Sequence, residues 1–189
     1  MSAGLLAGMT ATALATFVAL VLVRAALHKI ADPGRFEGVL ADYRLAPEAT
    51  LPWLRRGIPL VEAGCALALV FPGSRTLGGV AAAGLLLAYA LAMAVNLVRG
   101  RREIDCGCGG APEPLGWGLV ARNLGLVLAL APAVASAGTL PGPGATLAAW
   151  VPAVFGLLAW LAAEQGMANQ ARIAGDRRSL LASAFGGRA

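Results

Sequence analysis

The sequence predicts an all-α integral membrane protein, a helical bundle with four core transmembrane helices and a fifth C-terminal transmembrane helix. Composition is the first reason, because 58% of the 189 residues are hydrophobic and only 13% are charged, whereas soluble domains carry about a quarter charged residues. The second reason is that the hydrophobic residues, with a mean hydropathy of +0.73, form separate runs long enough to cross a bilayer. The third is that basic residues lie beside these runs, as membrane topology requires.

Net charge and cysteine content narrow the class further. A net charge of +5 is compatible with binding to nucleic acid, but the basic residues flank the apolar runs and no aromatic-basic recognition motif is present. We therefore expect membrane lipid, and no nucleic acid, as the partner of these charges. Three cysteines are too few for a disulfide-stabilised scaffold.

The first crossing is predicted at about residues 5–28. It has no basic region before it and no clear small-residue cleavage site after it, so we expect it to remain in the protein rather than act as a removable signal peptide. Asp32 and Pro33 then form a typical helix start, with a capping carboxylate followed by proline at the first helical position. Apolar residues at helical spacing from Phe36 to Tyr43 predict a short amphipathic helix lying on the membrane.

Four more crossings follow, at about residues 54–71, 77–98, 117–137 and 146–163. The second is short and is interrupted by Pro59 and Glu62. Residues 1–165 are thus predicted to form a single transmembrane bundle in which residues 99–116 form a loop, and residues 166–189 a basic tail. A Pro-Gly-Pro-Gly turn at 141–144 separates the last two crossings.

Basic residues predict the orientation. Nearly all of them fall in the first connection, in the 99–116 loop or in the tail, and only Arg75 falls on the other side. Since short cytoplasmic loops collect Lys and Arg, we expect a multi-pass protein of the bacterial inner (plasma) membrane. Its amino terminus is predicted outside, with the 99–116 loop and the tail in the cytoplasm.

Polar side chains within the crossings form a second pattern. At 1.5 Å per residue, they fall in one layer within roughly 10–15 Å of the cytoplasmic surface. Because charges at membrane depth usually face the bundle interior, we expect Glu62 to form an ion pair with Arg122 or Arg24. The members of this supporting polar layer are Arg24, His28, Glu62, Asn96, Arg122 and Asn123.

Each member of the layer also has a purely structural interpretation. Arg24 and the neighbouring Lys29 can reach the interface by extending their side chains, and Asn96 and Asn123 can join helices by hydrogen bonds. His28 can be an interface residue. Glu62 can take part in a structural pair rather than in proton transfer.

Cys106 and Cys108 are the strongest candidate for chemistry. One glycine separates them, so a disulfide requires a sharp bend, which Gly107 permits. The resulting small ring is strained and therefore readily exchanged. Arginines before the pair favour thiolate. The sequence leaves open a redox pair, a static bridge and a two-thiolate clamp for Cu(I) or another soft metal. Cys65 is a candidate third thiol or inert packing.

Several short motifs lie along the chain: His28-Lys29, Asp32-Pro33 with Phe36, Tyr43-Arg44-Leu45, Glu62, Asn96 with Arg99-Gly100-Arg101, Asp105-Cys106-Gly107-Cys108-Gly109 and Arg122-Asn123. Together they resemble the MauE family of methylamine utilisation proteins, which are related to DoxX-like membrane proteins. The resemblance runs from about Arg24 to Leu130, and Gly110 departs from it, because the family commonly has Phe-Gly after the second cysteine. The fifth crossing and the tail carry no matching motif.

This resemblance implies a role in maturation of the small, disulfide-rich subunit of methylamine dehydrogenase, or of a similar disulfide-containing client, with a thioredoxin-like partner. The implied client is periplasmic, whereas the charges place the thiols in the cytoplasm. The strain expected in a Cys106–Cys108 bridge, the nearby arginines and this resemblance together predict a thiol–disulfide exchange protein. A protein that handles soft metals or mercurials and a non-catalytic assembly subunit are the alternatives. No cofactor is predicted, and a quinone is left open.

Overall fold

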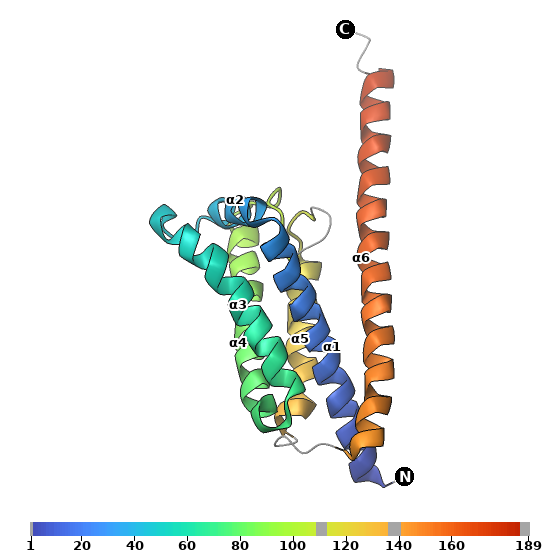
Figure 1. Cartoon of the computed structure of the whole chain (residues 1–189). Coiled ribbons are helices and arrows are strands. Elements are labelled where there is room, and N and C mark those ends of the chain that lie inside the picture. Colours follow the sequence, from blue (N-terminus) through green and yellow to red (C-terminus); the bar gives the residue numbers. More distant parts are fainter. Residues whose placement is uncertain (1, 109–112, 136–140, 186–189) are drawn as a thin grey trace.

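The computed structural model describes residues 2–108, 113–135 and 141–185, and for most residues beyond Gly166 only the helical backbone. The described chain is helical, without strands, which confirms the predicted all-α membrane bundle. Figure 1 shows the helices running alternately between the two ends of the bundle. The elements are α1 (Ala3–Ala31), α2 (Pro33–Tyr43), η1 (Glu48–Thr50), α3 (Leu51–Val70), η2 (Pro72–Ser74), α4 (Arg75–Val98), α5 (Trp117–Ala135) and α6 (Pro143–Phe185).

Within the described part of the chain, four segments are long and apolar enough to cross a membrane: Ala3–Ala31, Pro72–Val98, Trp117–Ala135 and Pro143–Gly166. The α3 helix is not one of them. It nevertheless packs lengthwise against α1 and α4 as a member of the bundle (Figure 1). Its polarity comes from Arg55, Arg56 and Glu62. The helix begins at Leu51 and runs through Pro59 without a break, so the proline that the sequence marked as an interruption lies inside a continuous helix.

Other boundaries agree closely with the sequence pattern. The Asp32 side chain caps α2, accepting a hydrogen bond from the Arg35 backbone N–H at 3.0 Å, and Pro33 takes the first helical position. The α2 helix ends at Tyr43, and the next residue, Arg44, adopts a left-handed conformation with φ 49°. The α5 helix begins at Trp117 as predicted, whereas the predicted end of that crossing, at 136–137, lies outside the described residues. The α6 helix continues without a break into the region predicted to be a tail.

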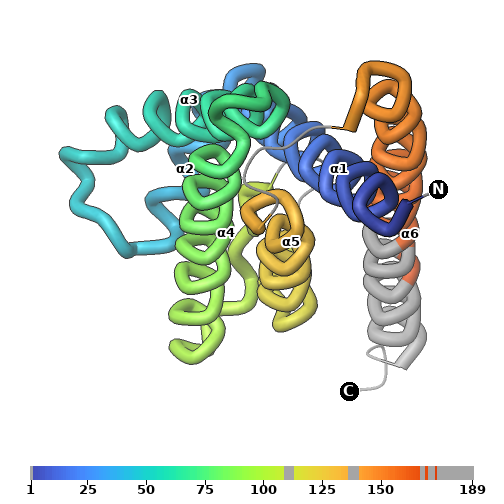
Figure 2. Tube along the Cα trace, turned by 90° about the horizontal axis from the view of Figure 1, so that it is seen from below, coloured from blue at the N-terminus to red at the C-terminus, as the bar shows by residue number. Residues whose placement is uncertain are grey.

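The bundle core lies between α1, α3, α4 and α5. Large buried side chains from all four helices meet there, including Val18, Leu22, Leu69, Leu86 and Leu130. Viewed along the bundle in Figure 2, α6 lies at the side of α1. Within the described residues this contact includes Trp160 and Phe17, whose ring centroids are 5.8 Å apart in an edge-to-face arrangement.

We call the two ends of the bundle the loop end, which carries α2 and the 99–116 connection, and the opposite end, which carries η2 and the amino terminus (Figure 1). The opposite end is closed by tight packing. A Cβ on Gly78 would lie only 2.7 Å from the backbone of Ala68. The α3 and α4 helices therefore approach so closely there that only glycine fits at position 78. Arg75 is 2% exposed and donates to the Leu69 carbonyl at 3.3 Å and to Thr12 Oγ1 at 3.1 Å.

Candidate functional site

The cysteine loop is folded back on itself at the loop end. The backbone N–H of Cys106 donates to the Glu113 carbonyl at 3.0 Å, and that of Leu115 donates to the Ile104 carbonyl at 3.1 Å. The side chains of Ile104 and Leu115 are buried, and they fasten the loop to the ends of α4 and α5. The glycines at 109–110, which the sequence places in the same turn, lie outside the described residues.

The predicted bend between the two cysteines is present. Gly107 has φ +68°, a conformation that side chains rarely adopt, and a Cβ there would lie 2.8 Å from Val39 Cγ1. The bend brings the backbone N–H of Cys108 to 3.3 Å from Cys106 Sγ, and Cys108 Sγ to 3.7 Å from the Cys106 carbonyl oxygen. Both thiols are free and partly buried, so the structure holds the pair as a dithiol.

The α2 helix covers this bend. Phe36 and Val39 are its buried residues, and Tyr43 donates its hydroxyl to the Cys106 carbonyl at 3.2 Å. Arg35 forms an ion pair with Asp105, with Nη2 and Oδ2 2.6 Å apart. The predicted amphipathic helix therefore covers the thiol loop with its apolar face and holds the loop in place with its polar residues.

Glu62 has a different ion-pair partner from the ones predicted. Its side chain is fully buried, and Oε1 accepts from Lys29 Nζ at 2.7 Å and from the Tyr89 hydroxyl at 2.9 Å. The predicted pairing with Arg122 or Arg24 is therefore wrong. Lys29, interpreted from sequence as extending to the interface, is only 5% exposed and turns inward between α3 and α4.

The two arginines pair instead with α6. Arg24 Nη1 lies 2.8 Å from Glu164 Oε2, and Arg122 Nη1 lies 3.3 Å from Glu164 Oε1. Trp160 donates its ring N–H to Glu164 Oε1 at 2.9 Å. Arg122 also lies 3.6 Å from Glu113 of the cysteine loop. The role of Glu164 as their partner could not be predicted from the sequence. Nothing in a lone glutamate near the end of an apolar run indicates which helix α6 packs against.

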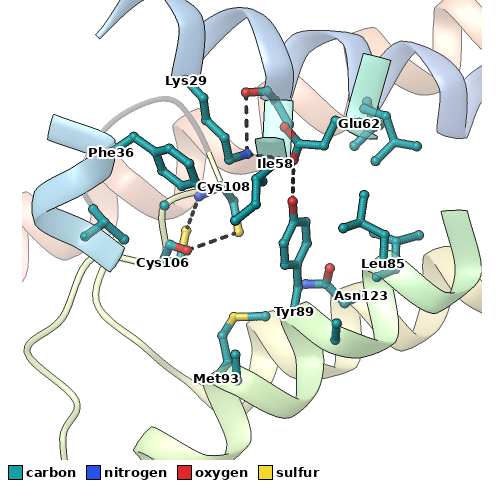
Figure 3. A pocket seen from close by; sticks show the side chains of 18 of the residues that line it. Lys29, Phe36, Ile58, Glu62, Leu85, Tyr89, Met93, Cys106, Cys108 and Asn123 are labelled. Atoms are coloured by element: carbon teal, nitrogen blue, oxygen red, sulfur yellow. Dashed lines mark hydrogen bonds and ion pairs between the residues drawn. The ribbon is translucent and has the colours of Figure 1, made fainter. Parts of the chain in front are cut away.

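A cavity of about 340 Å³ lies beneath the thiol pair, inside the loop end of the bundle (Figure 3). Its walls are mostly apolar, from residues such as Leu86 and Met93. Six residues named from the sequence line it: Cys106, Cys108, Arg24, Glu62, Arg122 and Asn123. The structure adds Lys29, Tyr89, Trp160 and Glu164 to this lining.

The remaining sequence candidates lie elsewhere. His28 is exposed and borders a smaller pocket of about 140 Å³ outside α1. Cys65 is buried in the hydrophobic core with Leu69, and it is not part of the cavity lining. Asn96 is fully buried and accepts from Arg101 Nη1 at 3.0 Å, so it anchors the start of the loop rather than facing the cavity.

The two thiols differ in acidity. The hydrogen bond from the Cys106 thiol is the largest influence that lowers the pKa of Cys108, to about 7, and the cations Arg122 and Lys29 act in the same direction against burial. That same hydrogen bond, together with burial and the charge of Cys108, raises the pKa of Cys106. Cys108 is therefore the thiolate of the pair, and the cations that favour it are Arg122 of α5 and Lys29 of α1 rather than the loop arginines that the sequence suggested.

A metal ion held by Cys106 and Cys108 would have few further ligands. Among the described residues, no group of three or more His, Cys, Asp or Glu side chains is arranged to hold a metal ion. The soft groups of this cavity wall are the two thiols and the Met93 thioether, so a bound Cu(I) would have few further ligands there.

Comparison with known proteins shows to which family the chain belongs. The family profile described as methylamine utilisation protein MauE matches residues 7–137, which is more than half of the sequence. The chain belongs to the MauE family. The matched stretch contains the cysteine loop and every predicted site residue, and it ends before α6. No solved structure matches the chain.

Individual relatives agree with this assignment. The methylamine utilization protein MauE of Paracoccus denitrificans is 43% identical over 126 residues, which cover 66% of this chain and 67% of the relative. The protein of the same name from Methylophilus methylotrophus is 45% identical over 92 residues, 49% of this chain and 48% of the relative. That of Methylorubrum extorquens is 39% identical over 119 residues, 60% and 62% of the two chains. The chain thus matches about half to two thirds of these relatives' lengths.

Proposed function

We propose that this protein is a membrane thiol–disulfide exchange protein of methylamine utilisation, in which Cys106 and Cys108 alternate between a dithiol and a disulfide. The observation that carries the proposal is the bend at Gly107, which keeps both thiols free and folds Cys108 back so that its backbone N–H lies 3.3 Å from Cys106 Sγ. A disulfide across one residue is strained, and strained disulfides exchange readily. The names of the relatives support the pathway.

The two cysteines have separate roles in the exchange. Cys108, with the lower pKa, attacks a partner disulfide and forms a mixed disulfide while the partner's other sulfur leaves as a thiolate. Cys106 then attacks Cys108 Sγ, which closes the internal disulfide and releases the partner as a dithiol. The reverse sequence passes a disulfide to a reduced client. Arg122 and Lys29 favour the thiolate form of Cys108 throughout.

The family resemblance supplies the partners of this exchange. We take a thioredoxin-like protein as the exchange partner and the small subunit of methylamine dehydrogenase, or a similar disulfide-containing protein, as the client. The exposed edge of the cysteine loop is the surface that the thioredoxin-like partner would meet, since α2 covers the other side.

We propose that the loop end faces the cytoplasm of a bacterial inner membrane. Arg35, Arg55 and Arg101 are three of the basic residues at the loop end, whereas the opposite end has Arg75. A periplasmic client would then lie across the membrane from the thiols, so reducing equivalents would have to pass through the bundle, where Cys65 lies in the hydrophobic core. Labelling of intact cells with an impermeant maleimide decides the side: labelling of Cys108 would reverse this orientation.

The exchange itself is tested with purified protein and oxidised glutathione. In graded glutathione buffers, maleimide mass shifts should show Cys106 and Cys108 moving together between dithiol and disulfide. The Cys106→Ser variant should accumulate a glutathione adduct on Cys108, and the Cys108→Ser variant should form far less adduct on Cys106. Cys65→Ser is the matched control, because it removes a buried thiol outside the cavity and should change neither result.

A pair that stays in one redox state across all buffers would exclude exchange. The double variant Cys106→Ser, Cys108→Ser separates the assembly alternative. If this variant still supports maturation of the client, the protein acts as a scaffold rather than through its thiols.

A further inference from the structure

Within the redox role proposed above, we propose that the cavity beneath the thiol pair binds the ring of a lipid-soluble quinone, which accepts two electrons from Cys106 and Cys108. The cavity volume of about 340 Å³ falls in the usual range for small-molecule sites, about 300–1,000 Å³. The lining has the composition of such a site, with mostly apolar walls and a few polar groups.

An unpartnered carboxylate oxygen beside the cavity points to a ligand with a hydroxyl group, because a carboxylate oxygen accepts hydrogen bonds. Glu62 Oε1 accepts from both Lys29 and Tyr89, whereas Oε2 is buried and has no hydrogen-bond partner among the described residues. A buried carboxylate oxygen without a partner is costly. Oε2 exposes no surface to the cavity as it stands, so the carboxylate would first turn toward that space. A hydroxyl donor there would then satisfy it, and the reduced form of a quinone carries two.

The thiols occupy another part of the same cavity wall. Cys106, Cys108 and Glu62 all line the cavity, the cysteines from the loop and Glu62 from α3 (Figure 3). A ring bound between these groups would meet the sulfurs on one side and the Lys29–Glu62–Tyr89 group on another. Lys29 would also stabilise negative charge as it develops on the ring.

The reaction balances without another reactant. Cys108 gives up its proton on forming the thiolate, and Cys106 gives up its proton as the S–S bond forms between them. The pair thereby releases two electrons and two protons. The quinone takes up both electrons and both protons, so that its two carbonyl oxygens become hydroxyls. The Glu62 carboxylate then accepts a hydrogen bond from one of these hydroxyls through the oxygen that is otherwise unpartnered.

Other occupants fit less well. An acyl chain would fill the apolar walls but offers neither a donor to Glu62 nor a place for the electrons. A water-soluble disulfide carries charges that these walls do not match. A quinone combines an apolar ring and tail with two oxygens, and it is soluble in the lipid around the bundle.

Binding is tested on the full chain in lipid nanodiscs with a fluorescent hydroxyquinoline N-oxide that carries a heptyl tail. We expect saturable quenching of its fluorescence, reversed by excess short-chain ubiquinone. Met93→Trp, which fills the cavity from α4, should weaken binding at least about tenfold. Leu91→Trp is the matched control, because Leu91 lies on the same helix, is 66% exposed and does not line the cavity.

Leu40→Trp provides a second cavity-filling variant, at a half-buried residue of α2 where a larger side chain is easier to accommodate. The Cys106→Ser, Cys108→Ser variant should no longer reduce short-chain ubiquinone, because it lacks both thiols. Electron transfer is followed by adding short-chain ubiquinone to the reduced protein, which should yield one disulfide for each quinone reduced.

The outcomes separate this inference from the proposed function. If glutathione oxidises the thiols but the probe does not bind and ubiquinone has no effect, the quinone site is overturned and the exchange function stands. If the probe binds but neither ubiquinone nor glutathione forms the disulfide, both the exchange function and the electron transfer are overturned. Equal probe binding by Met93→Trp, Leu40→Trp and Leu91→Trp would place binding outside the cavity and overturn the site.

Discussion

The two ends of the bundle each bury a cation, but they bury it in opposite ways. At the opposite end, Arg75 donates to a backbone carbonyl and a threonine hydroxyl, in a region where α3 and α4 pack without space for a Cβ on Gly78. At the loop end, Lys29 pairs with a buried carboxylate beside a cavity of about 340 Å³. One end is thus closed by packing, and the other keeps charged groups around an open space.

This difference indicates where stability and function lie. Close helix contact through small residues is a common way to stabilise a membrane bundle. Buried charges and an unfilled volume both reduce stability, and they are usually found where a protein binds or reacts with something. The tight end therefore supports the bundle, and the loop end holds the site.

The largest effect on stability is expected at Lys29, and it distinguishes this buried cation from Arg75. Lys29→Met leaves Glu62 as an uncompensated buried carboxylate, so the free energy of unfolding should fall by about 3–5 kcal/mol. Adding Glu62→Gln to the same chain should recover much of this loss. Arg75→Met should cost only about 1–2 kcal/mol, because no described carboxylate pairs with Arg75. Unfolding in detergent micelles gives these values, and equal losses for the two single variants would remove the distinction.

The tight end should be sensitive to a single methyl group. Gly78→Ala places a Cβ against the α3 backbone and should lower the free energy of unfolding by about 1–3 kcal/mol. Gly84→Ala, on an open face of the same helix, should leave stability unchanged or raise it slightly. The comparison uses the same micelle unfolding measurement. A stable Gly78→Ala variant would mean that the helices at this end are free to separate.

The loop end should show a pH dependence that the opposite end lacks. Because the pKa of Cys108 is lowered to about 7, its reaction with iodoacetamide should reach half its maximal rate near neutral pH. Arg122→Gln removes a cation that favours the thiolate, so the pKa rises and the half-maximal point should move upward by about one pH unit. The rate should then fall at pH 7 and be unchanged in strong base. Arg101→Gln, whose side chain binds Asn96, is the control and should leave the curve in place.

The smallest effect is expected at α6. Glu164→Gln weakens the ion pairs to Arg24 and Arg122, which are partly exposed, so the loss of stability should be about 0.5–1 kcal/mol. A cross-link between cysteines placed at Gly8 of α1 and at Pro141, just before α6, should still form, since the apolar contact between Phe17 and Trp160 remains. Loss of that cross-link would show that the ion pairs, rather than the apolar contact, hold α6 in place.

The sequence by itself determined the features that depend on neighbours along the chain. Apolar runs predicted the helices, Asp32 and Pro33 predicted the start of α2, and Trp117 the start of α5. The bend at Gly107 was also predictable, because one glycine between two cysteines is a local constraint. The family resemblance came from the same local motifs and is confirmed by the match over residues 7–137.

Only the tertiary structure decided which charges meet. Arg24 and Lys29 are five residues apart, so at 3.6 residues per turn they point about 140° apart around α1. Arg24 therefore faces Glu164 of α6, and Lys29 faces Glu62 of α3. Depth in the membrane, which the sequence gives, places all these residues in one layer, but the rotation and packing of each helix select the partners and leave the cavity between them.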